Sequence, residues 1–191
     1  MALDRRVKYT RMALKESLLA LLQDRPISRI TIKAICEGAD INRATYYAHY
    51  ADQYDQLNQI ELDFIDGINT FLDSLSTAAD ALAVIERIID YVYENQALCR
   101  TLLSPNGDIG FEAKVEQLVR DRVCAAWHIA PPDPGTFLDF TYTYIVNGGV
   151  GVIKKWICGE QARQSPREMA EYINGLCYKG LQELIREGMQ G

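Results

Sequence analysis

Residues 42–49, Asn-Arg-Ala-Thr-Tyr-Tyr-Ala-His, gather several hydrogen-bonding side chains into one short segment. Arginine, threonine, tyrosine and histidine can all donate hydrogen bonds to base edges or to phosphate oxygens of nucleic acid. On a helix that begins after Asn42, the side chains expected to face outward are Arg43, Thr45, Tyr47 and His49. The segment therefore predicts a surface that can contact DNA.

Two short helices are needed to present this surface, and residues 31–50 have the spacing for them. Thr31 is a candidate N-cap for the first helix, and Asn42 for the second, which is expected to end near His49. A short turn between the two is typical of a helix-turn-helix. The side chains expected to pack inward and hold the angle against a preceding helix are Ile32, Ile35, Ile41 and Tyr46.

Catalytic and metal-binding motifs are not apparent in the chain. It has two histidines, His49 and His128, and the sequence contains no HExxH, no GxSxG and no paired carboxylates with a partner histidine. We therefore expect no enzyme activity, no metal site and no cofactor. The alternative is a helical transferase or hydrolase that uses His49 or Cys99. The glycines in 148–151 are not followed by Gly-Lys-Ser/Thr, so a phosphate-binding loop is not expected there.

Charge is distributed unevenly along the 191 residues, whose net charge is −6. Residues 1–50 carry nine Lys and Arg against five Asp and Glu, so the acidic excess lies in the remainder. A localised DNA-binding surface would give this pattern, although a window of this length also drifts by a few charges by chance. No segment is apolar enough for a signal peptide or membrane helix, so we expect a cytoplasmic protein without membrane contact.

Apolar residues recur with helical spacing through the whole chain, and no strand-like alternation is found. We therefore predict an all-α protein of about nine helices. Residues 1–51 would form a three-helix helix-turn-helix domain, and 52–191 a larger helical bundle for regulation and dimerisation. Besides the two short helices, the predicted helices span 5–24, 53–75, 79–103, 109–127, 135–159 and 166–188.

Three segments carry a family resemblance: Thr31-Ile-Lys-Ala-Ile, Ala39-Asp-Ile-Asn-Arg-Ala-Thr-Tyr-Tyr-Ala-His-Tyr50, and Asp52-Gln-Tyr-Asp-Gln-Leu57. Together they resemble the TetR family of transcriptional regulators. Further along, Tyr144-Ile-Val-Asn-Gly-Gly-Val-Gly-Val-Ile-Lys-Lys-Trp156 is similar to the dimer helix of the branch that includes regulators of dihydroxyacetone metabolism. The resemblance implies binding to a double-stranded operator, expected to be an inverted repeat.

The resemblance also assigns roles to individual residues. It places Thr31, Arg43, Ala44, Thr45, Tyr47 and His49 at DNA, through base edges or phosphates. Lys33, Asn42 and Gln53 are further candidate DNA-binding residues, Lys33 through its charge. A packing or surface role is the alternative for Lys33, Tyr47 and His49. Asp40 stands where the family usually has glycine, and aspartate tolerates the left-handed turn expected there. Gln53 replaces the usual phosphate-directed lysine, which should lower DNA affinity.

The 135–159 helix is apolar on nearly every side, and its glycines cost about 1 kcal/mol each relative to alanine. Close approach of another backbone would compensate, so this helix and the 166–188 helix are expected to form a homodimer interface across a two-fold axis. The interface residues predicted are Gly148, Val152, Trp156, Ile173, Leu176, Gly180 and Leu184.

Members of the family often enclose a small-molecule pocket. Candidate ligand-binding residues are Phe64, Tyr91, Trp127, Tyr142 and Asn147, chosen because each combines a large or aromatic surface with a polar tip or lies beside one, although residues of these types are more often ordinary core. We predict a dimeric, sequence-specific regulator that represses nearby genes until an effector of unknown identity changes the spacing of its two DNA-binding heads. The alternative is a helical adaptor or activator that answers to a protein partner and has no small-molecule effector.

Overall fold

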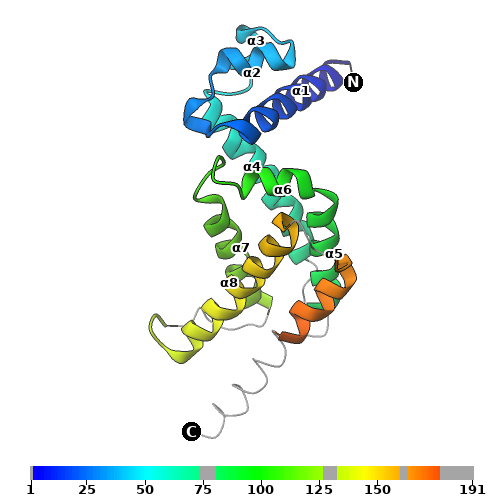
Figure 1. Cartoon of the computed structure of the whole chain (residues 1–191), viewed down its shortest axis with the longest axis vertical. Helices are drawn as coiled ribbons and strands as arrows, with labels where there is room; N and C mark the ends of the chain where they lie inside the picture. The colour runs from blue at the N-terminus through cyan, green and yellow to red at the C-terminus, as the bar shows by residue number, and fades with distance from the viewer. Residues whose placement is uncertain (1, 74–80, 127–132, 160–162, 177–191) are drawn as a thin grey trace, which may run out of the picture. The chain divides into compact units, whose positions relative to one another are not determined.

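The computed structural model describes residues 2–73, 81–126, 133–159 and 163–176 (Figure 1). Helices and their connections account for these residues and no strand occurs among them, which confirms the all-α prediction. A further helical segment covers 166–176. The other helices are α1 (Ala2–Asp24), the 3-10 turn η1 (Ile27–Arg29), α2 (Ile32–Ala39), α3 (Arg43–Tyr47), α4 (Gln53–Leu72), α5 (Ala81–Glu94), α6 (Gln96–Leu102), α7 (Phe111–Ala126) and α8 (Phe137–Cys158).

The chain divides into two compact units. The head unit is Met1–Ile65 with Ala97–Phe111, and the body unit is Asp66–Gln96 with Glu112–Gly191. The first part of α4 therefore belongs to the head unit and the rest to the body unit. These are divisions by packing. The functional domains 1–51 and 52–191 stay a prediction.

The core of the head unit is built on one face of α1. Leu14, Leu18 and Leu22 follow one another at four-residue spacing and are fully buried. α1 packs against α2 and α2 against α3, as the blue and light-blue helices of Figure 1 show. The buried side chain of Gln56 in α4 donates a 2.8 Å hydrogen bond from Nε2 to the backbone oxygen of Leu14. These contacts make the first four helices one packed structure.

The predicted N-caps at Thr31 and Asn42 are confirmed. Thr31 Oγ1 accepts a hydrogen bond from the backbone nitrogen of Ala34 at 3.2 Å, and Asn42 Oδ1 accepts one from Thr45 at 2.8 Å. Asp52 Oδ1 likewise accepts from the backbone nitrogens of the first turn of α4. Each cap satisfies backbone donors that a helix start leaves without an intrahelical partner.

Two helices differ from their predicted extent. The single helix expected over 79–103 is two helices, α5 and α6, which are separated at Asn95. The side-chain amide of Asn95 donates a 2.8 Å hydrogen bond to the backbone oxygen of Tyr91, and asparagine that bonds to nearby backbone in this way favours helix ends. α3 ends at Tyr47, so His49 lies in the turn that follows, where its backbone nitrogen donates to the oxygen of Tyr46.

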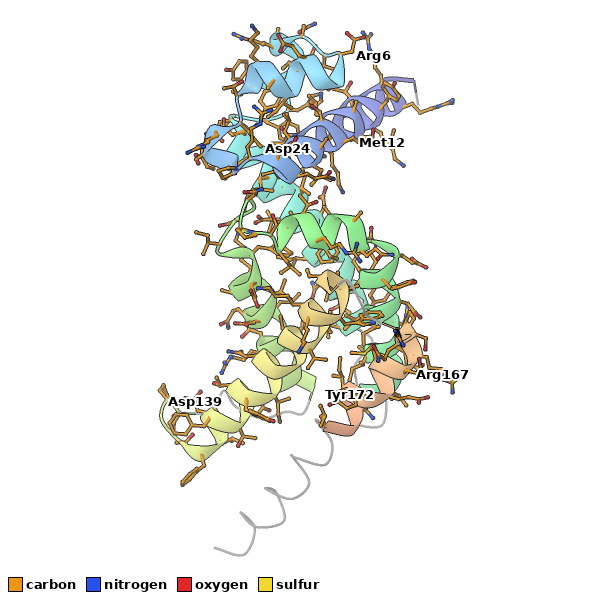
Figure 2. The ribbon with its side chains drawn as sticks, in the orientation of Figure 1. Arg6, Met12, Asp24, Asp139, Arg167 and Tyr172 are labelled. Atoms are coloured by element: carbon orange, nitrogen blue, oxygen red, sulfur yellow. The ribbon has the colours of Figure 1, made fainter. Side chains whose placement is uncertain are left out.

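Polar contacts join the helices of the body unit. Arg120 of α7 forms an ion pair of 3.6 Å with Asp139, which lies in the first turn of α8 (Figure 2). Near the other end of α8, the ring of Trp156 stacks on Tyr93 with 5.5 Å between centroids, and its Nε1 donates to the backbone oxygen of Gln164 at 3.1 Å. No helix in the described ranges is long and apolar enough to cross a membrane.

Candidate nucleic-acid interface

α3 has one buried and one exposed face. The side chain of Tyr46 is fully buried, whereas the neighbouring Tyr47 exposes 57% of its surface. Arg43 and Ala44 are also exposed, and Thr45 is half-buried. The helix is therefore anchored through its inner side and presents the side chains of its first turn to solvent.

The turn before α3 sets the direction in which the helix leaves the head unit. Asp40 adopts the left-handed conformation with φ 54° and ψ 43°, as expected from its position. The backbone nitrogen of Ile41 then donates to the oxygen of Cys36 at 3.0 Å, which closes the end of α2. Asn42 caps the next helix directly afterwards. The chain thus reverses within a few residues and keeps its backbone groups paired.

Aromatic packing holds the inner side of α3. The Tyr46 ring contacts Tyr47 edge-on at 5.7 Å and Tyr50 at 5.6 Å between centroids. Burial raises the pKa of the Tyr46 phenol, and nearby carboxylates, Asp52 first among them, raise it further. Tyr46 therefore stays neutral in the folded protein and acts as a packing residue, in agreement with its predicted inward position.

The basic side chains near α3 differ in whether they are already engaged in an ion pair. Within the described residues Arg43 forms no ion pair, whereas Lys33 pairs with Glu37 at 3.6 Å across one turn of α2. Burial raises the pKa of the Cys36 thiol, and the nearby Arg43 partly opposes that rise. The thiol is thus neutral, and the guanidinium is the available cation at the start of α3.

The other predicted contact residues flank α3. Thr31 is exposed and caps α2, Asn42 is exposed and caps α3, and Gln53 is the half-buried first residue of α4. His49 is half-buried beside the ring of Tyr50 at 6.2 Å. All the predicted DNA-contacting residues therefore lie in the head unit, from the start of α2 to the start of α4. Their roles stay predictions.

Arg11 of α1 is a supporting residue that the sequence pattern did not reveal. Its guanidinium donates to Gln59 Oε1 at 3.3 Å and lies 3.9 Å from Asp63, both in α4. A side-chain hydrogen bond with Tyr50 raises the pKa of Arg11 further above its ordinary value. Arg11 thus joins α1 to α4 and to the end of the helix-turn-helix. No local signal marks it, because its partners lie about 40 to 50 positions away.

The candidate ligand-binding residues are divided between the two units. Phe64 is buried in the head unit against Phe111, with 6.0 Å between ring centroids. Tyr91 packs in the body unit over Gly67, where an added Cβ would overlap its phenol ring. Tyr142 is buried and Asn147 is exposed, both in α8, while Trp127 lies outside the described residues. A ligand role for these residues stays a prediction.

The predicted interface residues are also unevenly exposed. Trp156 and Ile173 are buried within their own chain, whereas Gly148 and Leu176 are exposed and Val152 is half-buried. Gly180 and Leu184 lie outside the described residues.

The large exposed apolar side chains of α8 lie nearer its start. Phe137 is 90% exposed, Phe140 60% and Tyr144 80%. They precede Gly148 and Gly151 at helical spacing, and no atom of the described chain outside the helix backbone comes within 4 Å of a Cβ added at either glycine. The described part of the chain therefore leaves this α8 face, formed by Phe137, Phe140, Tyr144, Gly148 and Gly151, uncovered.

A family model described as a transcriptional regulator C-terminal region, of the TetR type, matches residues 80–179. The chain belongs to the TetR family of transcriptional regulators. The match covers the region that follows the helix-turn-helix, so it is independent of the motif in α2 and α3. This TetR-family chain and the curated HTH-type transcriptional regulator YxbF of Bacillus subtilis (strain 168) are 25% identical over 169 residues. That stretch is 83% of this chain but 42% of YxbF, so the chain spans about two fifths of its relative.

Solved structures of similar fold include three regulators. A TetR transcriptional regulator from Streptococcus agalactiae 2603V aligns with a TM-score of 0.66 and 21% identity over 93% of this chain and 98% of its own. The dihydroxyacetone kinase operon activator DhaS aligns with a TM-score of 0.61 and 18% identity, over 91% of this chain and 96% of its own. A TetR transcriptional regulator from Rhodococcus sp. RHA1 aligns with a TM-score of 0.55 and 19% identity, over 93% of this chain and 97% of its own. These structures show that the TetR fold extends over most of the chain.

Proposed function

We propose that this TetR-family protein is a dimeric, sequence-specific DNA-binding regulator in which α3 reads the major groove. The observation that carries the proposal is the division of α3 into a buried Tyr46 and an exposed first turn. A recognition helix must present its N-terminal side chains to base edges while its opposite side is held by the protein core. A regulator of this kind works at the chromosome, so the proposal implies a cytoplasmic protein.

The chemistry of the exposed first turn suits base recognition. Arg43 has no ion-pair partner among the described residues, and arginine donates two parallel hydrogen bonds to the O6 and N7 acceptors of guanine. Ala44 offers an apolar contact for a thymine methyl group, and the Thr45 hydroxyl can bond to several bases. Tyr47, exposed on the same helix, can donate to a phosphate.

Binding to the DNA upstream of the gene tests the proposal. The wild-type protein should give a complex that is sequence-selective and weakens as salt is raised. Arg43→Ala should weaken specific binding by about 1 to 3 kcal/mol and relax base preference at one position. Arg167→Ala is the matched control, because this exposed arginine lies in the 166–176 helix (Figure 2) and pairs with Glu171. Equal losses in both variants, or no selective complex, would contradict the proposal.

The uncovered α8 face supports the dimer. A contiguous exposed apolar surface on one helix is typical of a protein interface. The two glycines allow the backbones of two α8 helices to approach closely, which would offset their cost in helix propensity. Analytical ultracentrifugation should therefore show a dimer. Tyr144→Glu should yield monomers of unchanged helicity, because this side chain is 80% exposed in the single chain.

We propose repression of nearby genes, relieved by a small molecule. Activation in answer to a protein partner is the second candidate, because DhaS, which has the same fold, is an operon activator. Deletion of the gene separates the two, because transcription from the bound promoter should rise for a repressor and fall for an activator.

A further inference from the structure

The connection between α6 and α7 is attached to the end of α1 by Asn106. Its side-chain Nδ2 donates a 3.0 Å hydrogen bond to the backbone oxygen of Leu22, in the last turn of α1. Its own backbone oxygen accepts a 3.1 Å hydrogen bond from the backbone nitrogen of Ile27, the first residue of η1. All these residues belong to the head unit, although 84 positions separate Asn106 from Leu22.

Hydrogen bonds within the α6–α7 connection hold its backbone in place. Ser104 Oγ donates to the backbone oxygen of Thr101 at 2.8 Å and accepts from the backbone nitrogen of Asn106 at 3.3 Å. Gly107 donates to the oxygen of Ser104 at 3.1 Å, and a Cβ there would lie 2.7 Å from the oxygen of Leu102. Only glycine fits this close approach without a shift of the backbone. Asn106 is thus held by its neighbours in the position from which it contacts α1.

The contact lies at the C-terminal end of α1, just before the residues that lead into α2. The last four carbonyl groups of a helix have no intrahelical partner, and Leu22 carries one of them, two residues before Asp24 ends α1 (Figure 2). η1 and Thr31, the cap of α2, follow within a short stretch of chain. The position of η1 therefore determines where α2 begins, and α2 carries the turn that leads to α3.

We propose that Asn106 is a positioning residue for DNA recognition, which fixes the end of α1 and η1 and through them the start of the helix-turn-helix. This inference rests on the DNA-binding function proposed above. Asn106 lies inside residues 80–179, matched by the C-terminal region model, and the chain passes into the body unit after Phe111. The α6–α7 connection is therefore a covalent link, separate from α4, between the residues that hold the end of α1 and the body unit.

Asn106→Ala tests the proposal, with Asn95→Ala as the matched control. Asn95 also donates from Nδ2 to a helix carbonyl, at 2.8 Å, but it lies in the body unit directly after α5 and bonds to Tyr91 in that neighbouring helix. Hydrogen exchange of the free protein should become faster at the amides of residues 27–35 in the Asn106 variant and stay unchanged in the control. Both variants are compared at a temperature at which circular dichroism shows full helicity.

DNA affinity is the second measurement, made with a fluorescent fragment of the upstream region. Asn106→Ala should bind about fivefold more weakly, with an unchanged salt slope because no phosphate contact is removed. Asn106→Asp should bind more weakly still, since a carboxylate would face the carbonyl of Leu22. Asn95→Ala should stay within about twofold of the wild type.

The outcomes separate this inference from the proposed function. If residues 27–35 exchange at the wild-type rate in Asn106→Ala, the positioning role is overturned, whatever happens to DNA binding. An equal loss of affinity in the Asn95 control also overturns it, because general destabilisation then explains both. If the wild-type protein binds no DNA, the proposed function fails, and the exchange data still decide whether Asn106 fixes the start of α2. Should the alanine variant not fold, Asn106→Ser, which keeps a shorter donor, takes its place.

Discussion

The hydroxyl group of Ser17 in α1 donates a 2.8 Å hydrogen bond to the backbone oxygen of Ile35 in α2, and the pair is buried. Gly38 lies against the same hydroxyl, so closely that an added Cβ would overlap Ser17 Oγ. α1 and α2 therefore approach each other at a point where one residue must be small and the other must donate a hydrogen bond. This contact fixes the angle at which the helix-turn-helix leaves α1.

Gly38→Ala should destabilise the protein by about 1 to 3 kcal/mol, because the new methyl group overlaps a buried side chain. Ser17→Ala alone should cost about 1 kcal/mol through the lost hydrogen bond. The double variant should be more stable than Gly38→Ala, since the overlap is removed and alanine favours the helix. Urea unfolding of the four proteins measures the coupling, and simple additivity of the two losses would contradict the contact.

Asn42→Ala should shift α3 toward the unfolded conformation. The variant loses the hydrogen bond from the backbone nitrogen of Thr45 to the Asn42 side chain, which caps this five-residue helix. A loss of about 1 kcal/mol is expected in thermal unfolding. Asn42→Asp keeps the cap and adds a negative charge, so its stability should match the wild type while its DNA affinity falls. If both variants lose stability equally, capping is not the role of Asn42.

Gln53→Lys should strengthen DNA binding. The new cation at the start of α4 adds one phosphate contact, so the slope of log K against log salt should become steeper by about one. Asn58→Lys adds the same charge to an exposed position five residues further along α4 and serves as the control. A steeper slope in both proteins would indicate a general effect of charge rather than a contact at residue 53.

Gly148→Ala should stabilise the α8 helix of the single chain but weaken dimerisation. No atom outside the helix backbone lies within 4 Å of the added Cβ in the described chain, so α8 should gain up to about 1 kcal/mol of helix stability. The methyl group would nevertheless keep two α8 helices apart and weaken dimerisation. Gly149→Ala, where the added Cβ likewise meets no described atom outside the helix within 4 Å, gives the same gain in propensity on a different side of the helix. Sedimentation should show weaker association for Gly148→Ala alone.

The helix that covers 166–176 should fray in acid. Glu168 accepts hydrogen bonds from the backbone nitrogen and hydroxyl of Ser165, at 2.7 and 2.8 Å, and these bonds hold the pKa of Glu168 below its ordinary value of 4.5. Because the folded-state pKa is the lower one, the stabilisation is present above pH 4.5 and is lost as pH falls through the folded-state value. NMR of the Glu168 carboxyl carbon measures this titration. Ser165→Ala should return the pKa toward its ordinary value.

Short-range features of this chain could be predicted from the sequence, since their cause lies within a few residues. The caps at Thr31 and Asn42 and the left-handed Asp40 each depend on a residue and its close neighbours. The buried side of α8 could not be predicted, because a helix that is apolar on nearly every side does not indicate which of its side chains pack against the same chain. Trp156 is in fact buried within the chain, whereas Phe137 is exposed.

Long-range hydrogen bonds could not be predicted at all. Asn106 looks like an ordinary turn residue after Pro105, and nothing near it in the sequence indicates that its amide reaches Leu22. Arg11 likewise looks like one more charge on a basic helix, although it contacts Gln59 in α4. Such pairs depend on the packed fold, and helical periodicity carries no information about them.

The separation between Tyr46 and its exposed neighbours bears on how the protein can evolve. Folding depends on the buried ring, while the side chains at Arg43 and Ala44 make few demands on the core. On the proposed mode of DNA binding, single substitutions at these two positions can thus retarget the regulator to a new promoter at little expense in stability. The scaffold is well suited to designed libraries in which only those codons are randomised.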